Sequence, residues 1–279
     1  MSAPDGRPAH LEPETWDFYR AAMSALNAAG APYLVGGAYA FERYTGIERH
    51  TKDFDIFCRR EDAEPILDLL RDTIGSRTEV TFPHWLGKAY NPPTGDFVDV
   101  IYSSGSGIAV VDDEWFANST DAEVLGIPAA LCPAEEMIWS KAFIMERERY
   151  DGSDIAHLLH ARAKDLDWER LLRRFDEKWR VLMSHLLLFG FAYPGKREEV
   201  PAWVMDELVR RLSAEAGTPP ESARLCRGTL LSRAQFLVDI EKWGYEDARL
   251  EPQIQMSAGD IRHWTKAIGD QNRRREDHR

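Results

Sequence analysis

Cysteine is scarce in this sequence, with three residues among 279. Cys58, Cys132 and Cys226 are an odd number and include no CxxC pair. That pattern argues against a disulfide framework and against a zinc site built on paired cysteines. We therefore expect three reduced thiols that serve as small buried side chains.

Long apolar runs are also lacking. The longest mostly apolar stretch, residues 181–192, is far shorter than the roughly 20 residues that a membrane-spanning helix needs. Residues 1–13 are polar and do not combine a basic region with an apolar core, as a secretion signal does. These absences predict a soluble, cytoplasmic protein without a membrane partner.

The sequence also lacks an excess of positive charge. It has 35 Lys and Arg residues and 47 Asp and Glu residues, which gives a net charge of −12. Such a field repels phosphate backbones, so an RNA partner would need a local basic patch. Arg224, Arg227 and Arg233 are the candidate residues for that patch. The sequence also lacks a GxxxxGK[ST] phosphate-binding loop and a complete dinucleotide fingerprint.

Hydrophobic periodicity predicts an α/β (α+β) fold, with a small mixed sheet flanked by helices and an all-α carboxyl-terminal region. In the first part we expect helices at 14–29, 38–43 and 61–74 and strands at 33–35, 53–58, 78–82, 85–90, 97–102 and 108–111. Further helices are expected at 134–149, 154–163, 168–188, 203–216 and 222–243, and the run 186–189 is interpreted as helical core. We expect a domain at 1–165, a helical region at 166–271 and a disordered tail at 272–279, which has no apolar residue.

Three aspartates carry the clearest chemical signal. Asp53 and Asp55 are two residues apart on an expected strand, so both carboxylates project from one face while Phe54 points into the core. Asp99 on another expected strand would join them if the two strands are neighbours, with Asp96 in the preceding turn as the alternative third acid. Three such anions repel each other, a cost that divalent cations with oxygen ligands offset. Paired metals of this kind are the usual arrangement for in-line nucleotidyl transfer.

A glycine pair supplies a possible phosphate cradle. Gly36 and Gly37 stand between an expected strand and an expected helix, where the backbone can approach an anion and the helix presents N–H groups. Shortly before the acids, Arg49, Thr51 and Lys52 add two cations and a hydroxyl that suit triphosphate oxygens. The alternative interpretation of the glycine pair is a simple turn from strand to helix.

These motifs resemble the polymerase-beta-like nucleotidyltransferase superfamily, and most closely its small bacterial members, including the AbiEii-like toxin group. The matching runs are LVGGAYA at 34–40, RHTKDFD at 49–55 and FVDV at 97–100. The resemblance implies that Gly36 and Gly37 hold nucleotide phosphates and that Asp53, Asp55 and Asp99 are catalytic metal ligands. It further implies that Asp99 deprotonates the acceptor hydroxyl. Ala38 departs from the family pattern, because many members have Ser or Thr there, so one hydroxyl contact to phosphate is missing.

The likeness extends to Lys141 and Asp154. Lys141 lies on an otherwise apolar face of an expected helix, which a buried anion would explain. Related enzymes have a lysine here that reaches the nucleotide phosphates, and residues 151–158 resemble the aspartate motif that follows it. The alternatives are a Lys141 that extends past its apolar stem to solvent and an Asp154 that stabilises the first turn of a helix.

The resemblance implies a Mg²⁺-dependent nucleotidyltransferase, with Mn²⁺ as an alternative metal, in the domain 1–165. It would move an NMP from an NTP, ATP among them, to a hydroxyl of a small molecule, a protein or an RNA such as tRNA, and release pyrophosphate. The toxin-like relatives imply a toxin–antitoxin-like role with a regulatory protein partner. The alternative is a non-catalytic nucleotide-binding or regulatory interaction protein of the same fold.

Overall fold

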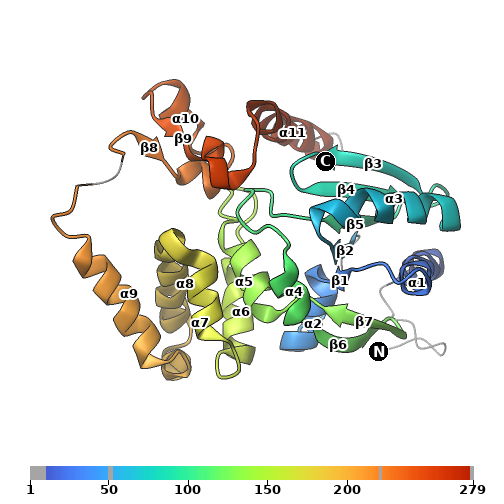
Figure 1. Ribbon diagram of the computed structural model, residues 1–279, viewed down its shortest axis with the longest axis horizontal. Coiled ribbons are helices and arrows are strands. Elements are labelled where there is room, and N and C mark those ends of the chain that lie inside the picture. Colours follow the sequence, from blue (N-terminus) through green and yellow to red (C-terminus); the bar gives the residue numbers. More distant parts are fainter. Residues whose placement is uncertain (1–10, 50–52, 220–221, 277–279) are drawn as a thin grey trace. The chain divides into compact units, whose positions relative to one another are not determined.

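The computed structural model describes residues 11–49, 53–219 and 222–276, which form two compact units (Figure 1). The first unit comprises the described residues up to Gly105 together with Val110–Pro133. The second comprises Ser106–Ala109 together with the described residues from Ala134 onward. The domain limits at 165 and 271 stay predictions.

A seven-stranded mixed sheet forms the centre of the first unit, in the order β3-β4-β5-β2-β1-β7-β6. The strands are β1 (Leu34–Val35), β2 (Asp53–Phe57), β3 (Arg77–Phe82), β4 (Leu86–Tyr90), β5 (Phe97–Ile101), β6 (Thr120–Val124) and β7 (Ile127–Leu131). Strand β2 runs parallel to β5, and β1 runs parallel to β7, while the other neighbours are antiparallel. Strand β2 therefore lies inside the sheet, next to β5 on one side and β1 on the other.

Helices cover both faces of this sheet. They are α1 (Pro13–Ala28), α2 (Gly37–Thr45), α3 (Arg60–Ile74) and α4 (Asp113–Ala117). On one face the ring of Phe54 stacks on Tyr19 of α1, with ring centroids 5.1 Å apart. On the other face Phe57 stacks on Trp115 of α4 at 5.4 Å. Because strand residues alternate between faces, Asp53 and Asp55 share the face of Phe57.

The second unit is mostly helical. Its α-helices are α5 (Ala134–Ala142), α6 (Gly152–Arg162), α7 (Trp168–Phe175), α8 (Trp179–Ala192), α9 (Ala202–Ala214), α10 (Leu237–Glu241) and α11 (Ala258–Glu276). Short 3-10 helices cover Asp176–Lys178, Pro194–Glu199, Gly228–Leu230, Ala248–Leu250 and Pro252–Ile254, and β8 (Leu225–Cys226) pairs with β9 (Glu246–Asp247). Ion pairs join α5 to α7: Arg170 lies 2.7 Å from Glu135, and Arg174 lies 3.1 Å from the fully buried Glu136. Such pairing offsets the cost of burying these charges.

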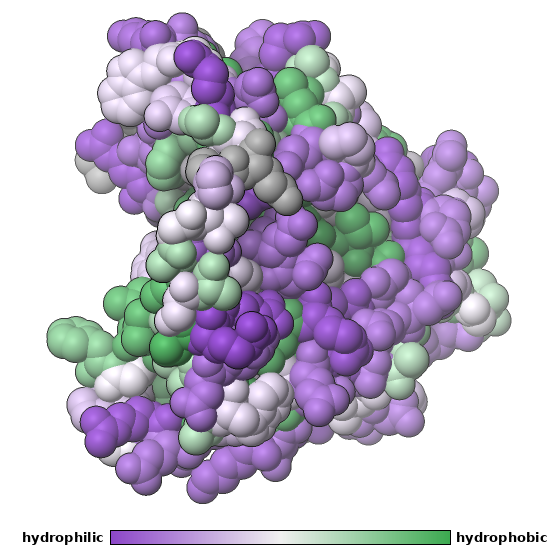
Figure 2. Space-filling view, turned by 60° about the vertical axis from the view of Figure 1, so that its left-hand side comes forward, coloured by the Kyte–Doolittle hydropathy of each residue, from purple (hydrophilic) through white to green (hydrophobic). Residues whose placement is uncertain are grey.

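The surface in Figure 2 is largely hydrophilic, with apolar residues gathered in separate patches. Helix α8 contributes apolar surface, because Leu187 and Leu188 are half exposed and Phe191 is 85% exposed. Leu186 and Phe189 of the same helix are buried. The expected core role of 186–189 is thus correct for two of its four residues. No helix in the described part of the chain has both the length and the apolar character of a membrane span.

The predicted fold class is confirmed, since a mixed sheet flanked by helices is followed by a mostly helical part. The expected helix at 134–149 ends at Ala142, and the one at 168–188 is interrupted at Asp176, where φ is 40°. The strand expected at 108–111 does not form, because Ile108 and Val111 are buried without joining a described ladder. An apolar run predicts burial, and burial does not require strand pairing.

Two larger errors concern the β6–β7 hairpin and residues 222–243. The hairpin was not expected, because β6 is a polar edge strand and β7 contains Pro128 and two alanines. The long helix predicted at 222–243 is wrong: the chain folds back so that the ring of Phe236 packs on Gly228. A continuous helix would separate these residues by about 12 Å.

Helix α11 extends through Glu276. The disorder expected for residues 272–279 stays a prediction. Residues 277–279 lie outside the described part of the chain.

Candidate active site

The register between β2 and β5 brings the three acids together. Asp55 and Asp99 are direct Cα partners in this parallel pair, so their side chains project from the same face. Asp53 lies two residues earlier on that face. One carboxylate oxygen from each of the three residues can be chosen so that all lie within 4.8 Å of one another. Asp53 and Asp55 are half-buried, and Asp99 is buried.

Asp96, the alternative third acid, is engaged elsewhere. It lies in the turn before β5, where the hydroxyls of Thr15 and Thr94 each donate a hydrogen bond of 2.7 Å to its Oδ2. It is not a member of the group defined by the 4.8 Å separation. The structure therefore places Asp99, rather than Asp96, beside Asp53 and Asp55.

Lys88 is a site residue that the sequence analysis missed. In the antiparallel pair of β4 and β5 it is the direct partner of Asp99, and its Nζ lies 2.5 Å from Asp99 Oδ1. Both side chains are largely shielded from solvent. The only sequence signal was a lysine inside an expected strand, and nothing local shows which residue of another strand it will face.

The Asp99 carboxyl is set apart by its environment. Burial raises its pKa from 3.8 to about 6, and the negative charge of Asp53 adds to the increase, while Lys88 opposes it. Desolvation and a like charge both disfavour the ionised form, whereas a hydrogen-bonded ammonium favours it. The pKa of the Asp99 carboxyl is therefore closer to neutral pH than the pKa of an ordinary aspartate.

Gly36 and Gly37 let the start of α2 approach the acid-bearing strand. The Gly36 N–H donates a 3.0 Å hydrogen bond to the Asp55 carbonyl, and a Cβ at Gly36 would lie 2.3 Å from a ring carbon of Phe57. Gly37 has φ of +53°, and a Cβ there would lie 1.8 Å from Asp55 Oδ2. The first N–H groups of a helix lack intrahelical acceptors and favour anions. Asp55 therefore lies next to the amino terminus of α2 and also belongs to the cluster of three carboxylates that could bind a metal ion.

The predicted basic residues before the acids are only partly described. The guanidinium of Arg49 lies over the ring of Phe41 in α2, 4.2 Å from its centroid. This is a cation–π contact. Thr51 and Lys52 lie outside the described residues.

Lys141 and Asp154 belong to the second unit, where they contact each other. The Lys141 ammonium donates hydrogen bonds to Asp151 at 2.9 Å and to Asp154 at 2.8 Å. Arg149 binds Asp151 as well. The chain itself therefore supplies buried anions for Lys141, and a role of Lys141 or Asp154 at a nucleotide stays a prediction.

This cluster makes stability depend on pH. Burial by itself would raise the pKa of Asp151, but the hydrogen bonds and charges of Arg149 and Lys141 outweigh it and lower the pKa from 3.8 to about 2. A lowered folded-state pKa contributes stability that is present above the unfolded value and lost as pH falls toward 2. We expect Asp151→Asn to lower the unfolding free energy by about 2 kcal/mol at pH 7 and by progressively less below pH 4.

Urea unfolding of both proteins at several pH values between 7 and 3 measures this difference. Asp165→Asn is the control. Asp165 is mostly exposed, and its ion pair with Arg162 is long at 3.6 Å, so the effect of this substitution on the unfolding free energy should stay small at every pH. A loss in Asp151→Asn that is equal at pH 7 and pH 3 would contradict the electrostatic origin.

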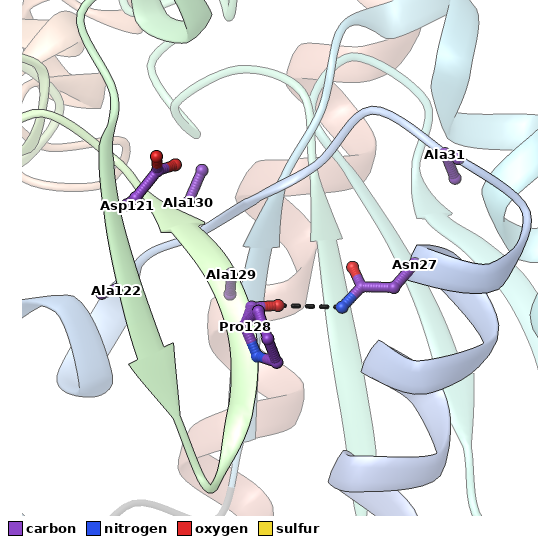
Figure 3. A pocket seen from close by; sticks show the side chains of 8 residues that line it. Asn27, Ala31, Asp121, Ala122, Pro128, Ala129 and Ala130 are labelled. Atoms are coloured by element: carbon purple, nitrogen blue, oxygen red, sulfur yellow. Dashed lines mark hydrogen bonds between the residues drawn. The ribbon is translucent and has the colours of Figure 1, made fainter.

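One surface pocket of the first unit lies apart from the acids (Figure 3). It has a volume of about 570 Å³ and lies between the end of α1 and the β6–β7 hairpin. Asn27 donates a 2.8 Å hydrogen bond to the Pro128 carbonyl at its wall. Its lining is Asn27, Gly30, Ala31, Asp121, Ala122, Pro128, Ala129 and Ala130. None of the three clustered aspartates lines it.

No protein-family model and no curated protein sequence matches this chain. The solved structures similar to it include the antibiotic-resistance factor ANT(2'')-Ia, with 16% identity, a TM-score of 0.42 and coverage of 63% of this chain and 98% of that one. A nucleotidyltransferase-like protein from Paracoccidioides brasiliensis has 15% identity, a TM-score of 0.44 and coverage of 69% and 94%. The lincosamide antibiotic adenylyltransferase LnuA has 15% identity, a TM-score of 0.38 and coverage of 53% and 98%. Likenesses this slight assign neither a family nor an activity to this chain, and membership of the AbiEii-like group stays a prediction.

Proposed function

We propose that the protein is a Mg²⁺-dependent nucleotidyltransferase that moves an NMP from an NTP to an acceptor hydroxyl. The observation that carries the proposal is the meeting of two features at Asp55. One is the group of three carboxylates within 4.8 Å, and the other is the amino terminus of α2 at Gly37. A metal-bound triphosphate presents cations and phosphate oxygens side by side, and these two features suit those two charges.

The donor set fits Mg²⁺. Asp53, Asp55 and Asp99 offer carboxylate oxygens, which are the ligands that Mg²⁺ prefers and that Mn²⁺ also accepts. A divalent cation would offset the mutual repulsion that contributes to the raised pKa of Asp99. When bound, it would supply charge neutralisation to the phosphoryl oxygens and to the leaving pyrophosphate.

The chain's own residues would position the reactants. The N–H groups at the start of α2 would bind phosphate oxygens, and Asp53 and Asp55 would fix the orientation of the metal-bound triphosphate. A bond would form between the acceptor oxygen and the α-phosphorus, while the bond from that phosphorus to the bridging oxygen breaks and pyrophosphate leaves. Asp99 would accept the hydroxyl proton, because it lies beside the other two acids and a carboxylate can act as a general base.

The arginines suggested for RNA binding have partners within the protein. Arg224 donates to backbone carbonyls of Trp243 and Gly244, and Arg233 lies 3.2 Å from Glu146. Arg227 lies within 4 Å of two glutamates. The glutamates beside Arg227 and Arg233 reduce the positive potential that a phosphate backbone needs, whereas the carbonyls bound by Arg224 carry no net charge. These ion pairs favour a small-molecule or protein acceptor over tRNA, and a regulatory protein partner stays a prediction.

Label transfer tests the proposal. The protein is incubated with each α-labelled NTP, Mg²⁺ and separated protein, RNA and small-molecule fractions of a cell extract. We expect label to appear in one fraction, and only when Mg²⁺ is present. Thermal stabilisation by an NTP without transfer into any fraction would instead favour the non-catalytic nucleotide-binding alternative. In that case a ligand at 100 times its Kd would add about 2.7 kcal/mol of stability.

A further inference from the structure

A row of charged side chains crosses four strands on the acid-bearing face of the sheet. Glu79 of β3 pairs with Lys88 of β4, Lys88 pairs with Asp99 of β5, and Asp99 pairs with Asp55 of β2. Direct register partners project from the same face with their Cβ atoms about 5 Å apart. Lys88 is thus the cation that the sheet places next to the three acids.

Glu79 does not hold Lys88. Its carboxylate accepts hydrogen bonds from Arg77 at 2.9 Å, Tyr90 at 2.9 Å and Thr81 at 3.3 Å. The ammonium of Lys88 is instead hydrogen-bonded to Asp99. The lysine is therefore directed toward the acid cluster rather than toward the edge of the sheet.

Two contacts fix the position of the ammonium. It lies 2.5 Å from Asp99 Oδ1 and 3.8 Å from the centre of the Phe97 ring. The aromatic face attracts a cation, and the side chain of Lys88 is only 16% exposed. A long, flexible side chain held on two sides in this way acts as a fixed positive charge.

We infer that Lys88 is an internal counter-ion that limits the acid cluster to one tightly bound divalent cation, held chiefly by Asp53 and Asp55. The inference rests on the proposed function, because it concerns the metal site of that reaction. Three carboxylates carry a formal charge of −3, and Lys88 reduces it to −2, which one divalent cation balances. A second cation on the Lys88 side of Asp99 would meet an ammonium at close range, where like charges repel strongly.

The three acids alone predict a pair of metal ions. With Lys88 beside them, we expect one tightly bound ion in the absence of nucleotide. A second metal would bind tightly only when nucleotide phosphates bring further negative charge. Lys88 is accordingly a positioning residue, and its effect is measurable without any turnover.

Mn²⁺ binding to the full-length protein without nucleotide tests this inference. Free Mn²⁺ is followed by electron paramagnetic resonance, and heat release is followed by calorimetry. We expect one tight Mn²⁺ per wild-type chain. Lys88→Met should bind its first Mn²⁺ about tenfold more tightly than the wild type does and should also bind a second, weaker Mn²⁺, because two divalent cations exceed the charge of three carboxylates by only one. Lys88→Arg keeps the charge and should keep one. Lys88→Gln serves in place of Lys88→Met if that variant does not fold.

Arg77→Met is the matched control. It removes one positive charge from the same sheet face, but Arg77 is 61% exposed and pairs with Glu79 rather than with Asp99. Arg77→Met should bind one Mn²⁺, like the wild type. A second Mn²⁺ bound by Arg77→Met would show that the net charge of the protein, rather than the position of Lys88, sets the number of ions, and this would overturn the inference.

The remaining outcomes separate the inference from the proposed function. Two Mn²⁺ ions in the wild type, or a single Mn²⁺ in both the wild type and Lys88→Met, would overturn the role of Lys88 and leave the metal site in place. Absence of Mn²⁺ binding in both proteins would remove the metal site itself, and the inference with it.

Discussion

Replacing Asp53 and Asp55 together with asparagine is expected to reduce nucleotidyl transfer by about a thousandfold or more, equivalent to at least about 4 kcal/mol of transition-state stabilisation. The two substitutions remove two of the three carboxylates that lie within 4.8 Å of one another. Asparagine has nearly the same shape as aspartate, so Phe54 keeps its place against Tyr19 and the fold is retained. The loss should therefore appear in activity and in Mn²⁺ affinity while the melting temperature stays close to that of the wild type.

The measurement is the rate of label transfer at saturating Mg²⁺, with a thermal melt of each protein. Asp96→Asn is the matched control, because Asp96 accepts hydrogen bonds from Thr15 and Thr94 and is not part of the acid cluster. It should keep its transfer rate within a few-fold of the wild type. A double variant that also keeps its rate within tenfold would show that these acids are not the reaction site.

Gly37→Ala should damage both the site and the fold. The new methyl group would lie 1.8 Å from Asp55 Oδ2 and 2.7 Å from its Cγ, and φ at this position is +53°. Asp55 or the start of α2 must therefore move, and alanine also pays about 1 to 2 kcal/mol for the left-handed backbone. Together with the overpacking cost we expect about 3 kcal/mol of lost stability. Either movement changes how the Asp55 carboxylate and the start of α2 lie relative to each other, so Mn²⁺ affinity should fall at least about tenfold.

Gly46→Ala separates the two contributions. Gly46 follows the same helix and has φ of +71°, but no atom lies within 4 Å of a Cβ built there. It should lose about 1 to 2 kcal/mol from the backbone alone and bind Mn²⁺ like the wild type. Urea unfolding and Mn²⁺ titration of both variants measure these effects. Equal stability and equal Mn²⁺ affinity of the two variants would refute the close approach of Gly37 to Asp55.

Local patterns were sufficient for part of the site. The alternation of Asp53, Phe54 and Asp55 predicted two carboxylates on one face and an aromatic ring in the core, because side chains of a strand alternate with a period of two. The glycine pair between an apolar run and helix formers predicted the turn into α2. Such features depend only on neighbouring residues, so the sequence contains them directly.

The rest of the site depends on which strands pair and in what register. Asp99 joins Asp55 only because β2 and β5 are parallel neighbours, and Lys88 meets Asp99 only because β4 pairs with β5 in one particular register. A shift by one residue would turn every side chain of a strand to the other face. Likewise, Lys141 finds its anions ten and thirteen residues later in the chain.

The sequence by itself therefore determined the residue types, the faces of individual strands and the mixed α/β class. The tertiary structure alone decided which charges meet, because that choice is made by burial and strand pairing between distant segments. It also decided how far each helix extends, since Asp176 and Phe236 redirect the chain against local helical periodicity. The counter-ion Lys88 belongs wholly to this second group.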